Sequence, residues 1–403
     1  MKQINHHWSI DATVSSLHTL RKDRDEPQLK PRDRFHKTVN HEEPDRVPLD
    51  YWTTHQAYEN LRDYLGIKAP ETHRWGLFSP WKTSEELLRR LNVDFRHVHM
   101  KTAAGFKPQP LPDGSLEDEW KSGSKLIGEY DEVTYYPWAE FTEVEQVEEF
   151  DWPDPDDPSR MDGVRELAKH LHEETDYAVV GFIAGPWGIV EMAAHFMRGF
   201  DKFLVDLVRR PDLAEAMMDK SMKLAIEMHR VFLDEVGEYL DCLQVFDDLG
   251  HQYGLIMSPS VYRTLVKHRQ KKVYDDIHQR APHVKILYHT CGAIEPLIPD
   301  LIDVGVDILN PIQPLAKGMD SVVLKEKYGD KLTFHGGIDL QHVMSAQGSI
   351  EDVRAEVDTR INALAHGGGY ILAPAHNIQS ESTPQKILEL YDYAAKKGAY
   401  PLK

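Results

Sequence analysis

The sequence predicts an α/β protein, a (β/α)8 TIM barrel with an N-terminal arm and a β-hairpin insertion after strand 2. Short, nearly continuous apolar runs alternate along the chain with longer segments of helical period, which is the pattern of a parallel sheet covered by helices. Eight such units favour a closed barrel over a doubly wound sheet. No GxGxxG or GxxxxGK[ST] motif follows an early apolar run, so the commonest doubly wound nucleotide-binding folds are not expected.

The eight expected strands are separated by segments long enough for a helix. They lie at residues 47–52, 93–100, 177–185, 239–248, 284–292, 306–314, 332–340 and 370–378. Between them, residues 211–237 and 351–369 have the amphipathic pattern of helices, and the second ends in three glycines that signal a helix stop. The chain therefore alternates strand and helix from residue 47 almost to its C-terminus.

Two segments depart from this alternation. Residues 1 to about 35 are polar and mixed in charge, so residues 1–40 are expected to form a loosely held arm beside a barrel domain of residues 41–403. Residues 105–158 are rich in aromatic, β-branched and turn residues, which indicate a β-hairpin followed by a proline-rich connection. Such an insertion either shapes the rim of an active site or is a plain surface elaboration.

Composition limits the classes of function. Hydrophobic residues make up 41% and charged residues 28%, as in soluble globular proteins, and no apolar stretch approaches the roughly 20 residues that cross a bilayer. The first residues lack the basic segment and apolar block of a secretory signal, and the 2 cysteines cannot build a disulfide framework, so a cytoplasmic location is expected. The net charge of −19 is spread along the chain, which argues against nucleic acid and fits poorly with a substrate rich in carboxylates.

Polar side chains stand at the ends of six of the expected strands. In a TIM barrel the carboxyl ends of the strands meet at one mouth, where catalytic groups cluster. The pairs, in chain order, are His97 and His99, Asp247 and Asp248, His289 and Cys291, Asn310 and Gln313, His335 and Asp339, and His376 and Gln379. Stability alone does not require so many polar groups at one end of a barrel, so this end is expected to hold an active site.

The stretch HTC at residues 289–291 indicates a zinc site. Imidazole and thiolate are preferred zinc ligands, and residues two apart in a strand face the same side, so His289 and Cys291 can reach one ion. A catalytic zinc needs three protein ligands, and His376 at the end of the last strand is the expected third. Asp247 is expected either as a further contact or as the partner that orients a histidine. The alternative is that Cys291 is a small buried residue and His289 an ordinary hydrogen-bonded one.

Several motifs occur in the order seen in a known superfamily. In the C-terminal part of the chain they read DDLGHQYGLIMSP, HTCGAIEPLIPDLIDVGVDILNPIQP, FHGGIDLQ and ILAPAHNIQSESTP. Together with PDRVPLDYW, DWPDPDDPSR and GPWGIVEMAAHFMRGFDKFL further upstream, they resemble the uroporphyrinogen decarboxylase superfamily over nearly everything after the first 40 residues. The resemblance implies the same (β/α)8 barrel.

Two branches of that superfamily do different chemistry. True decarboxylases resemble one another in an arginine-rich RQAGRY segment after the first strand and in a Ser-Asp pair after the second. Here those places read DYWTTHQAYENL, with no arginine until Arg62, and FRHVHM. The other branch contains zinc methyltransferases that work with corrinoid proteins and share a His-x-Cys followed by a later Cys. His289 and Cys291 match the first two ligands, and His376 stands at the position of the final cysteine.

The resemblance implies a zinc-dependent methyltransferase, or demethylase, that moves a methyl group between a small substrate and a corrinoid or thiol acceptor. No D-x-H-x-x-G loop of a corrinoid carrier occurs in the chain, so any corrinoid is expected from a partner protein. The expected residues are His289, Cys291 and His376 for zinc, His335, Asp247 and Asp339 for catalysis, and His97, Asn310, Gln313 and Gln379 for the substrate. The alternatives are a metal-free decarboxylase, a zinc lyase or hydrolase, and a carrier without turnover; barrels of this family often form homodimers.

Overall fold

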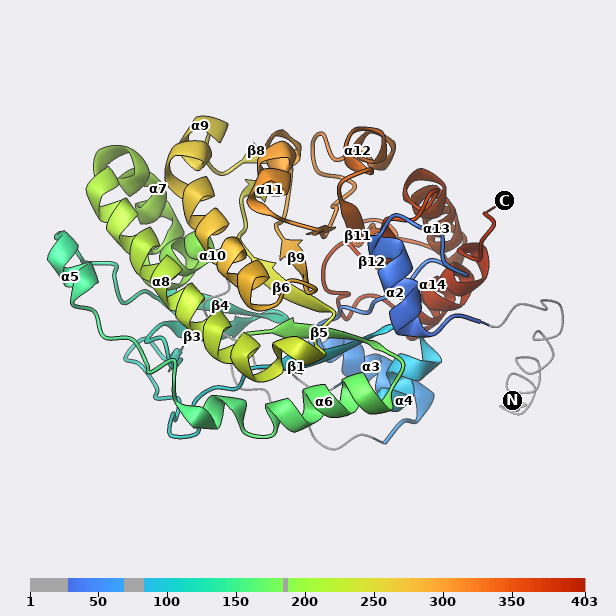
Figure 1. The fold of residues 1–403 in the computed structure, drawn as a ribbon, viewed down its shortest axis with the longest axis horizontal. Helices are drawn as coiled ribbons and strands as arrows, with labels where there is room; N and C mark the ends of the chain where they lie inside the picture. The colour runs from blue at the N-terminus through green and yellow to red at the C-terminus, as the bar shows by residue number, and fades with distance from the viewer. Residues whose placement is uncertain (1–27, 69–82, 184–187, 403) are drawn as a thin grey trace, which may run out of the picture.

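Seven strands form one parallel sheet in the computed structural model, which describes residues 28–68, 83–183 and 188–402 (Figure 1). In spatial order they are β1 (Phe95–His99), β5 (Ala178–Phe182), β6 (Cys242–Phe246), β9 (Lys285–His289), β10 (Ile308–Asn310), β11 (Thr333–Ile338) and β12 (Tyr370–Pro374). Each strand falls inside one of the expected apolar runs. Every pair of neighbours is parallel, so all seven carboxyl ends lie at the same edge of the sheet.

The expected strand at 47–52 closes the ring. Leu49 bridges Leu372 of β12 in parallel, and the backbone N–H of Asp50 donates to the carbonyl of Leu372 at 3.0 Å. On the other side, the N–H of Asp94, next to β1, donates to the carbonyl of Leu49 at 2.9 Å. The segment therefore lies between the two edge strands of the sheet. The predicted (β/α)8 barrel is confirmed.

Amphipathic helices surround the strands, as the alternating pattern predicts (Figure 1). They include α3 (His55–Leu65), α4 (Glu85–Arg90), α6 (Val164–Glu174), α7 (Phe200–Arg209), α8 (Pro211–Val236), α10 (Lys267–Arg280), α11 (Ile298–Val304), α12 (Ser321–Tyr328), α13 (Ile350–Leu364) and α14 (Pro384–Lys397). The last of these shows how the sequence specifies them. Thr383 accepts a hydrogen bond from the N–H of Lys386, Pro384 fits the first turn, and one apolar face is buried.

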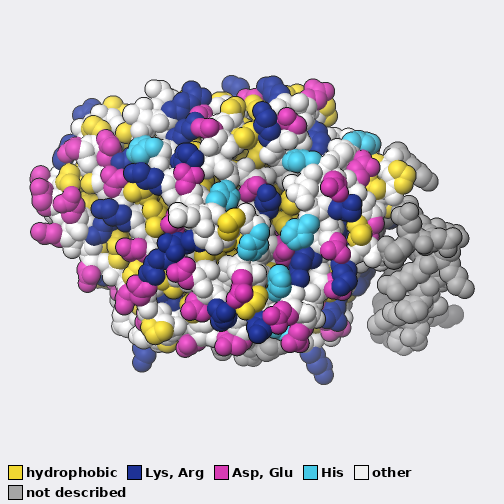
Figure 2. All heavy atoms as spheres, viewed as in Figure 1, with side chains coloured by type: hydrophobic (Ala, Val, Ile, Leu, Met, Phe, Trp, Pro, Cys, Tyr) yellow, Lys and Arg dark blue, Asp and Glu magenta, His cyan; other side chains and the backbone are white. Residues whose placement is uncertain are grey.

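None of the described helices is both long and apolar enough to span a membrane. The formal net charge of the chain is −19. Figure 2 shows acidic and basic side chains interspersed over the visible face, with no large area of a single sign.

The expected hairpin insertion is confirmed, and it has three strands. β2 (Leu116–Glu117), β3 (Gly123–Ile127) and β4 (Tyr130–Tyr135) form an antiparallel sheet, and a two-residue turn joins β3 to β4. Gly128 has a φ of 64° in that turn, a conformation that glycine adopts without strain. A cluster of aromatic side chains, Trp120, Trp138, Phe150 and Trp152, holds the insertion and its connection together.

The N-terminal segment differs from the expectation of a loose arm. Residues 1–27 lie outside the described residues, but α2 (Pro31–Val39) is a helix fixed to the barrel. Arg34 is 2% exposed and donates to both Asp45 and Asp94, while the Phe35 ring packs edge-on against Phe95 at 5.7 Å. A buried arginine with two carboxylate partners makes this helix part of the folded unit. The boundary at residue 40 stays a prediction.

Candidate metal centre

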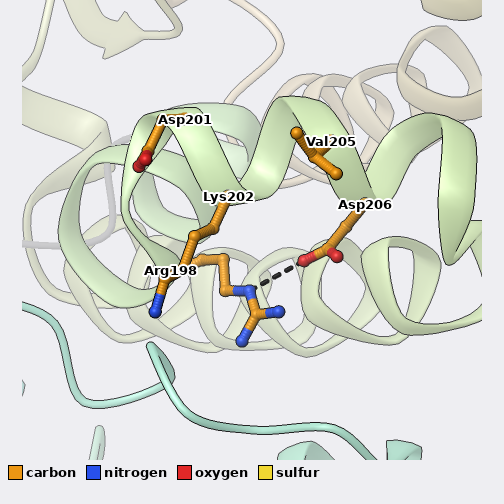
Figure 3. A pocket seen from close by; sticks show the side chains of 5 residues that line it. All are labelled: Arg198, Asp201, Lys202, Val205 and Asp206. Carbon is orange, nitrogen blue, oxygen red and sulfur yellow. Dashed lines mark hydrogen bonds and ion pairs between the residues drawn. The ribbon is translucent and has the colours of Figure 1, made fainter.

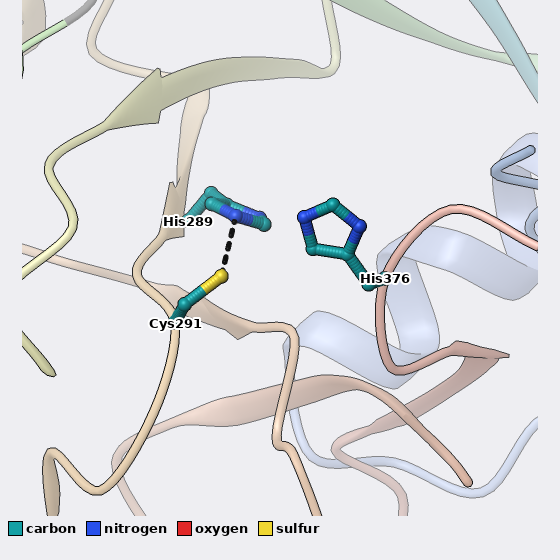
Figure 4. Close-up of side chains that lie close together, drawn as sticks. All are labelled: His289, Cys291 and His376. Carbon is teal, nitrogen blue, oxygen red and sulfur yellow. Dashed lines mark hydrogen bonds between the residues drawn. The ribbon is translucent and has the colours of Figure 1, made fainter. Parts of the chain in front are cut away.

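Three donor side chains converge at the carboxyl ends of β9 and β12 (Figure 4). His289 is the last residue of β9, Cys291 follows it by two residues, and His376 lies two residues after β12. One ligand atom of each residue lies within 4.8 Å of the others, and Cys291 Sγ is 3.4 Å from His289 Nε2. The fold thus brings together the three residues that the sequence predicts as a zinc site.

Aromatic rings fix the orientation of His289. The Trp52 ring is stacked on it at 5.7 Å and 20°, and the Phe246 ring lies 4.3 Å away at 30°. Trp52 ends the segment at 47–52 that closes the barrel, and Phe246 is the last residue of β6. His289 is 2% exposed, so its imidazole has little freedom to turn.

A buried chain of hydrogen bonds runs from His289 into the barrel. Its Nδ1 lies 2.5 Å from Asn310 Oδ1, Asn310 Nδ2 lies 2.6 Å from His335 Nδ1, and His335 Nε2 lies 3.0 Å from Asp50 Oδ2. All four side chains are at most 2% exposed. Burial alone would raise the pKa of Asp50, but its hydrogen bond with His335 brings that pKa below its usual value.

The chemistry of these groups fixes the direction of each bond. An ionised Asp50 only accepts, so His335 Nε2 donates to it and His335 Nδ1 accepts from the Asn310 amide. The carbonyl oxygen of Asn310 is then left to accept from His289 Nδ1. His289 therefore presents the lone pair of Nε2 toward Cys291, which is the tautomer that a metal requires.

His376 has a similar partner on its far side. Its Nδ1 lies 3.4 Å from the hydroxyl of Tyr130, which comes from the insertion, and the two rings are 5.9 Å apart. In Figure 4 the other ring nitrogen of His376 is turned toward His289 and Cys291. Each histidine thus has its Nδ1 occupied and its Nε2 directed at the space between the three donors.

The electrostatics of the three donors suit metal binding. Burial lowers the pKa of His289 and lowers that of His376 to about 4, so both imidazoles are neutral near pH 7. Burial and the nearby Asp248 carboxylate raise the pKa of the Cys291 thiol well above its usual value. A thiol that keeps its proton is a poor nucleophile, so this environment does not suit a cysteine that attacks a substrate. A bound cation would have to displace that proton.

The two aspartates after β6 have different surroundings, and a catalytic role for Asp247 stays a prediction. The Asp247 carboxylate accepts from the backbone N–H groups of Ile189, Val190 and Glu191 and from the Gln270 side chain, so it caps the π-helical segment Glu191–Arg198. Asp248 is the acidic residue at the donors. Its Oδ1 accepts from the N–H of Cys291 at 2.8 Å and lies 3.9 Å from His289 Nε2.

Alternation along the strand explains which aspartate faces the mouth. Phe246 points inward against His289, and residues two apart share a face, so Asp248 follows Phe246 and Asp247 points to the helices.

The two other predicted catalytic residues, His335 and Asp339, also have their side chains held by hydrogen bonds, and their catalytic roles stay predictions. His335 is 0% exposed, and both of its ring nitrogens are hydrogen-bonded, so it is placed to orient His289 through Asn310. The Asp339 carboxylate accepts from the N–H groups of Gln341 and His342, which makes it a support for the loop after β11.

The predicted substrate residues are divided by the structure. Asn310 is fully buried in the hydrogen-bonded chain, and Gln313 accepts from the N–H of Gly292 at 2.8 Å, so both support the donors. His97 lies on β1 with its ring 6.2 Å from that of His99. The Gln379 amide is exposed and lies 3.5 Å from the Tyr130 hydroxyl. Substrate contact by His97 and Gln379 stays a prediction.

Five residues at the site were not predicted from sequence: Asp50, Trp52, Tyr130, Glu191 and Phe246. Burial, then Asp248 and Asp247, raise the pKa of Glu191, and its Oε2 has no hydrogen-bond partner among the described residues. Asp50 could have been found, since a carboxylate inside the apolar run 47–52 is unusual in a buried strand. No local pattern marks Tyr130, because it reaches the site only through the fold of the insertion.

Figure 3 shows a depression at another place, on α7 and the last residue of the π-helical segment Glu191–Arg198. It is lined by Arg198, Asp201, Lys202, Val205 and Asp206. Arg198 donates to Asp206 at 2.7 Å and to the backbone carbonyls of residues 138, 139 and 141, so its guanidinium serves the fold. None of the predicted site residues lines this depression.

Known proteins similar to this chain support its resemblance to the uroporphyrinogen decarboxylase superfamily. A uroporphyrinogen decarboxylase of Prochlorococcus marinus (strain MIT 9515) is 24% identical over 247 residues, which cover 58% of this chain and 63% of that protein. A uroporphyrinogen decarboxylase of Parasynechococcus marenigrum (strain WH8102) is 25% identical over 232 residues, covering 56% and 60%. The chain thus spans less than two thirds of the length of either relative.

Among solved structures, a methyltransferase from Methanosarcina mazei has a similar fold. The TM-score is 0.64 at 19% identity, and the match covers 92% of this chain and 99% of that one. The family model described as uroporphyrinogen decarboxylase (URO-D) matches residues 120–397, which is well over half of the chain. With a barrel of the same kind and the motifs in the same order, the chain belongs to the uroporphyrinogen decarboxylase family.

Proposed function

We propose that this protein is a zinc-dependent methyltransferase that transfers a methyl group between a small substrate and a corrinoid or thiol acceptor. One observation carries the proposal: His289, Cys291 and His376 place three nitrogen and sulfur donors within 4.8 Å of one another at the mouth of the barrel. Imidazole and thiolate are the donors that zinc prefers, and three protein ligands leave a fourth position open, as catalytic zinc sites do.

The residues around the donors support the fit. The chain from Asp50 through His335 and Asn310 sets the tautomer of His289, as carboxylate or carbonyl partners do for histidines that bind metals. When bound, zinc would supply Lewis acidity toward a sulfur or oxygen of the substrate in the open position. The protein would orient that substrate atom and exclude water from it, with the Trp52 and Phe246 rings as apolar walls beside His289.

The segment after the first strand favours a methyltransferase over a decarboxylase. In true decarboxylases this place carries arginines that hold the substrate's carboxylates. Here it supplies Trp52, which stacks on His289, and Thr54, whose hydroxyl accepts from the N–H of Ala57 at the start of α3. A corrinoid, if it is the methyl carrier, would come from a partner protein, and a cytoplasmic location is part of the same proposal.

Metal content decides the first half of the proposal. Protein purified without added metal should hold about one zinc per chain by mass spectrometry, and His289→Ala, Cys291→Ala and His376→Ala should each lose it. His376→Cys restores the ligand set of the zinc methyltransferase branch and should keep the metal. A well-folded wild-type protein that takes up no zinc, even when zinc is offered, would rule the proposal out.

Activity decides the second half. The zinc-loaded protein should transfer methyl from methylcobalamin to a small thiol, or demethylate a methyl donor in the presence of a reduced corrinoid. The three alanine variants should be inactive and His376→Cys active. Activity that survives in all three alanine variants would point to metal-free chemistry in the same barrel.

A further inference from the structure

We propose that the tip of the insertion, residues 127–130, is a latched part of the metal centre, with Tyr130 and Glu129 as positioning residues for His376. This inference rests on the proposed zinc site and assigns a role to a segment that could equally have been a surface elaboration. The tip consists of the last residue of β3, the two-residue turn and the first residue of β4, so the antiparallel strand pair holds it from both sides.

A single carboxylate latches the tip to the barrel. Glu129 accepts from the N–H of Ser380 at 3.0 Å, from the Ser380 hydroxyl at 2.5 Å and from the Thr54 hydroxyl. Three donors on one carboxylate are charge-assisted hydrogen bonds, which are stronger than neutral ones. Exposed residues at the end of a surface hairpin do not need such contacts for their own stability.

The two anchoring loops are the loops of the metal centre. Thr54 follows Trp52 by two residues, and Trp52 stacks on His289. Ser380 follows His376 by four residues in the loop after β12. The latch therefore ties the insertion to the two segments whose positions determine how the two histidines stand relative to each other.

The hydrogen bonds of Glu129 position the next residue, Tyr130, beside His376. It follows Glu129 directly, its hydroxyl lies 3.4 Å from His376 Nδ1, and its ring meets the His376 ring edge-on at 5.9 Å. The hydroxyl oxygen can accept from Nδ1–H, which leaves the His376 Nε2 lone pair free for the metal. Gln379 approaches the same hydroxyl at 3.5 Å and helps to hold it. Asn310 accepts from Nδ1 of His289, and Tyr130 has the corresponding position at Nδ1 of His376.

Reciprocity gives the proposal a direct test. If the latched tip strengthens metal binding, then metal binding must stabilise the latched tip by the same free energy. Zinc should therefore slow hydrogen exchange at the amides of residues 126–131 in the wild-type protein. The same addition should leave exchange in β2, at the far edge of the insertion, unchanged.

The variants are Tyr130→Phe, which removes one hydroxyl, and Glu129→Gln, which puts an amide group against the donors of Ser380 and Thr54. Zinc affinity, from competition with a chelator, should fall about 10-fold in each, the lower end of the effect of removing a partner of a metal-binding histidine. In the cobalt-substituted protein the visible d–d bands should shift in both variants. Glu129→Gln should also speed exchange at residues 126–131.

Matched controls lie on the same small sheet. Glu132→Gln and Tyr135→Phe make the same chemical changes at exposed positions of β4 and should leave zinc affinity, cobalt bands and exchange at wild-type values. Zinc affinity in Tyr130→Phe and Glu129→Gln equal to that of these controls would overturn the inference while the zinc site stands. A wild-type protein that binds no zinc would overturn both.

Discussion

His289 Nδ1 lies 2.5 Å from Asn310 Oδ1, and this contact couples the surface of the metal centre to the interior of the barrel. In the row of hydrogen bonds from His289 to Asp50, the Asn310 side chain links the two histidines. Its carbonyl oxygen accepts from His289, and its NH2 group donates to His335. An amide is suited to this place because its two ends have opposite hydrogen-bonding character. The hydrogen-bond direction that Asp50 imposes on His335 thereby determines that His289 Nε2, which faces Cys291, carries no proton.

Asn310→Ala should weaken zinc binding by about 10- to 100-fold, because His289 loses the acceptor that fixes its tautomer and ring orientation. The measurement is competition with a chelator of known zinc affinity. Gln270→Ala is the control, since Gln270 is an equally buried amide that serves Asp247 and Tyr288 instead. Equal zinc affinity in the two variants would contradict the role assigned to Asn310.

Asp247→Ala should leave zinc stoichiometry unchanged and lower the free energy of unfolding by about 2 kcal/mol. The substitution leaves the buried N–H groups of Ile189 and Val190 without their acceptor. Urea denaturation and metal analysis of the same preparation measure both effects. Loss of zinc from a folded Asp247→Ala protein would show that the aspartate acts on the metal centre after all.

Asp248→Ala is the reverse case. Asp248 is part of the mouth and holds the N–H of Cys291, so its removal should weaken zinc binding about 10-fold with a smaller loss of stability. Comparing Asp247→Ala with Asp248→Ala tests whether Asp247 caps a helix while Asp248 supports the metal donors. Identical profiles for the two would refute the assignment by strand alternation.

The barrel could be predicted because its elements are specified locally. Strands such as β5 and β12 are nearly continuous apolar runs, since both of their faces are buried, and all seven strands occur inside the runs that the sequence shows. The N-terminal helix α2 could not be predicted in the same way. Its stability comes from Arg34 meeting Asp45 and Asp94, residues 11 and 60 positions away, and no local pattern reveals that pairing.

The clustering of the three possible metal ligands could be predicted for a similar reason. His289 and Cys291 are two apart at a strand end, and His376 is at the end of the last strand, so topology alone places them together. Both Asp247 and Asp248 stand at the end of their strand in the sequence, and strand alternation is what favours Asp248 as the one that faces the donors. Tyr130 depends on how a distant hairpin docks, which a single sequence does not encode in any short motif.

Arg34→Met should lower the free energy of unfolding by about 3 kcal/mol, because it leaves the fully buried Asp94 with one arginine partner in place of two. Chemical denaturation measures the loss. Arg89→Met is the control, since Arg89 pairs with Glu85 at the surface and an exposed pair contributes less than about 1 kcal/mol. An Arg34 variant as stable as this control would restore the view of α2 as a loose arm.

His229 should make stability fall as the solution becomes acidic. It is 0% exposed on α8, its Nδ1 donates to the carbonyl of Ala225, and burial lowers its pKa from 6.5 to about 4. Between about pH 6.5 and pH 4 the unfolded chain binds a proton there that the folded protein does not, so the free energy of unfolding decreases as pH falls through this window. Below about pH 4 both states are protonated and the effect levels off.

His229→Leu removes this group while keeping a side chain of similar size. The difference in free energy of unfolding between variant and wild type should therefore move in favour of the variant by about 3 kcal/mol from pH 7 to pH 4. Taking the difference at each pH cancels the buried carboxyls, such as Asp247, whose pKa burial raises to about 6 and whose contribution has the opposite sign. If the free energies of unfolding of the two proteins ran parallel with pH, His229 would have the same pKa in the folded and unfolded states, which would contradict this prediction.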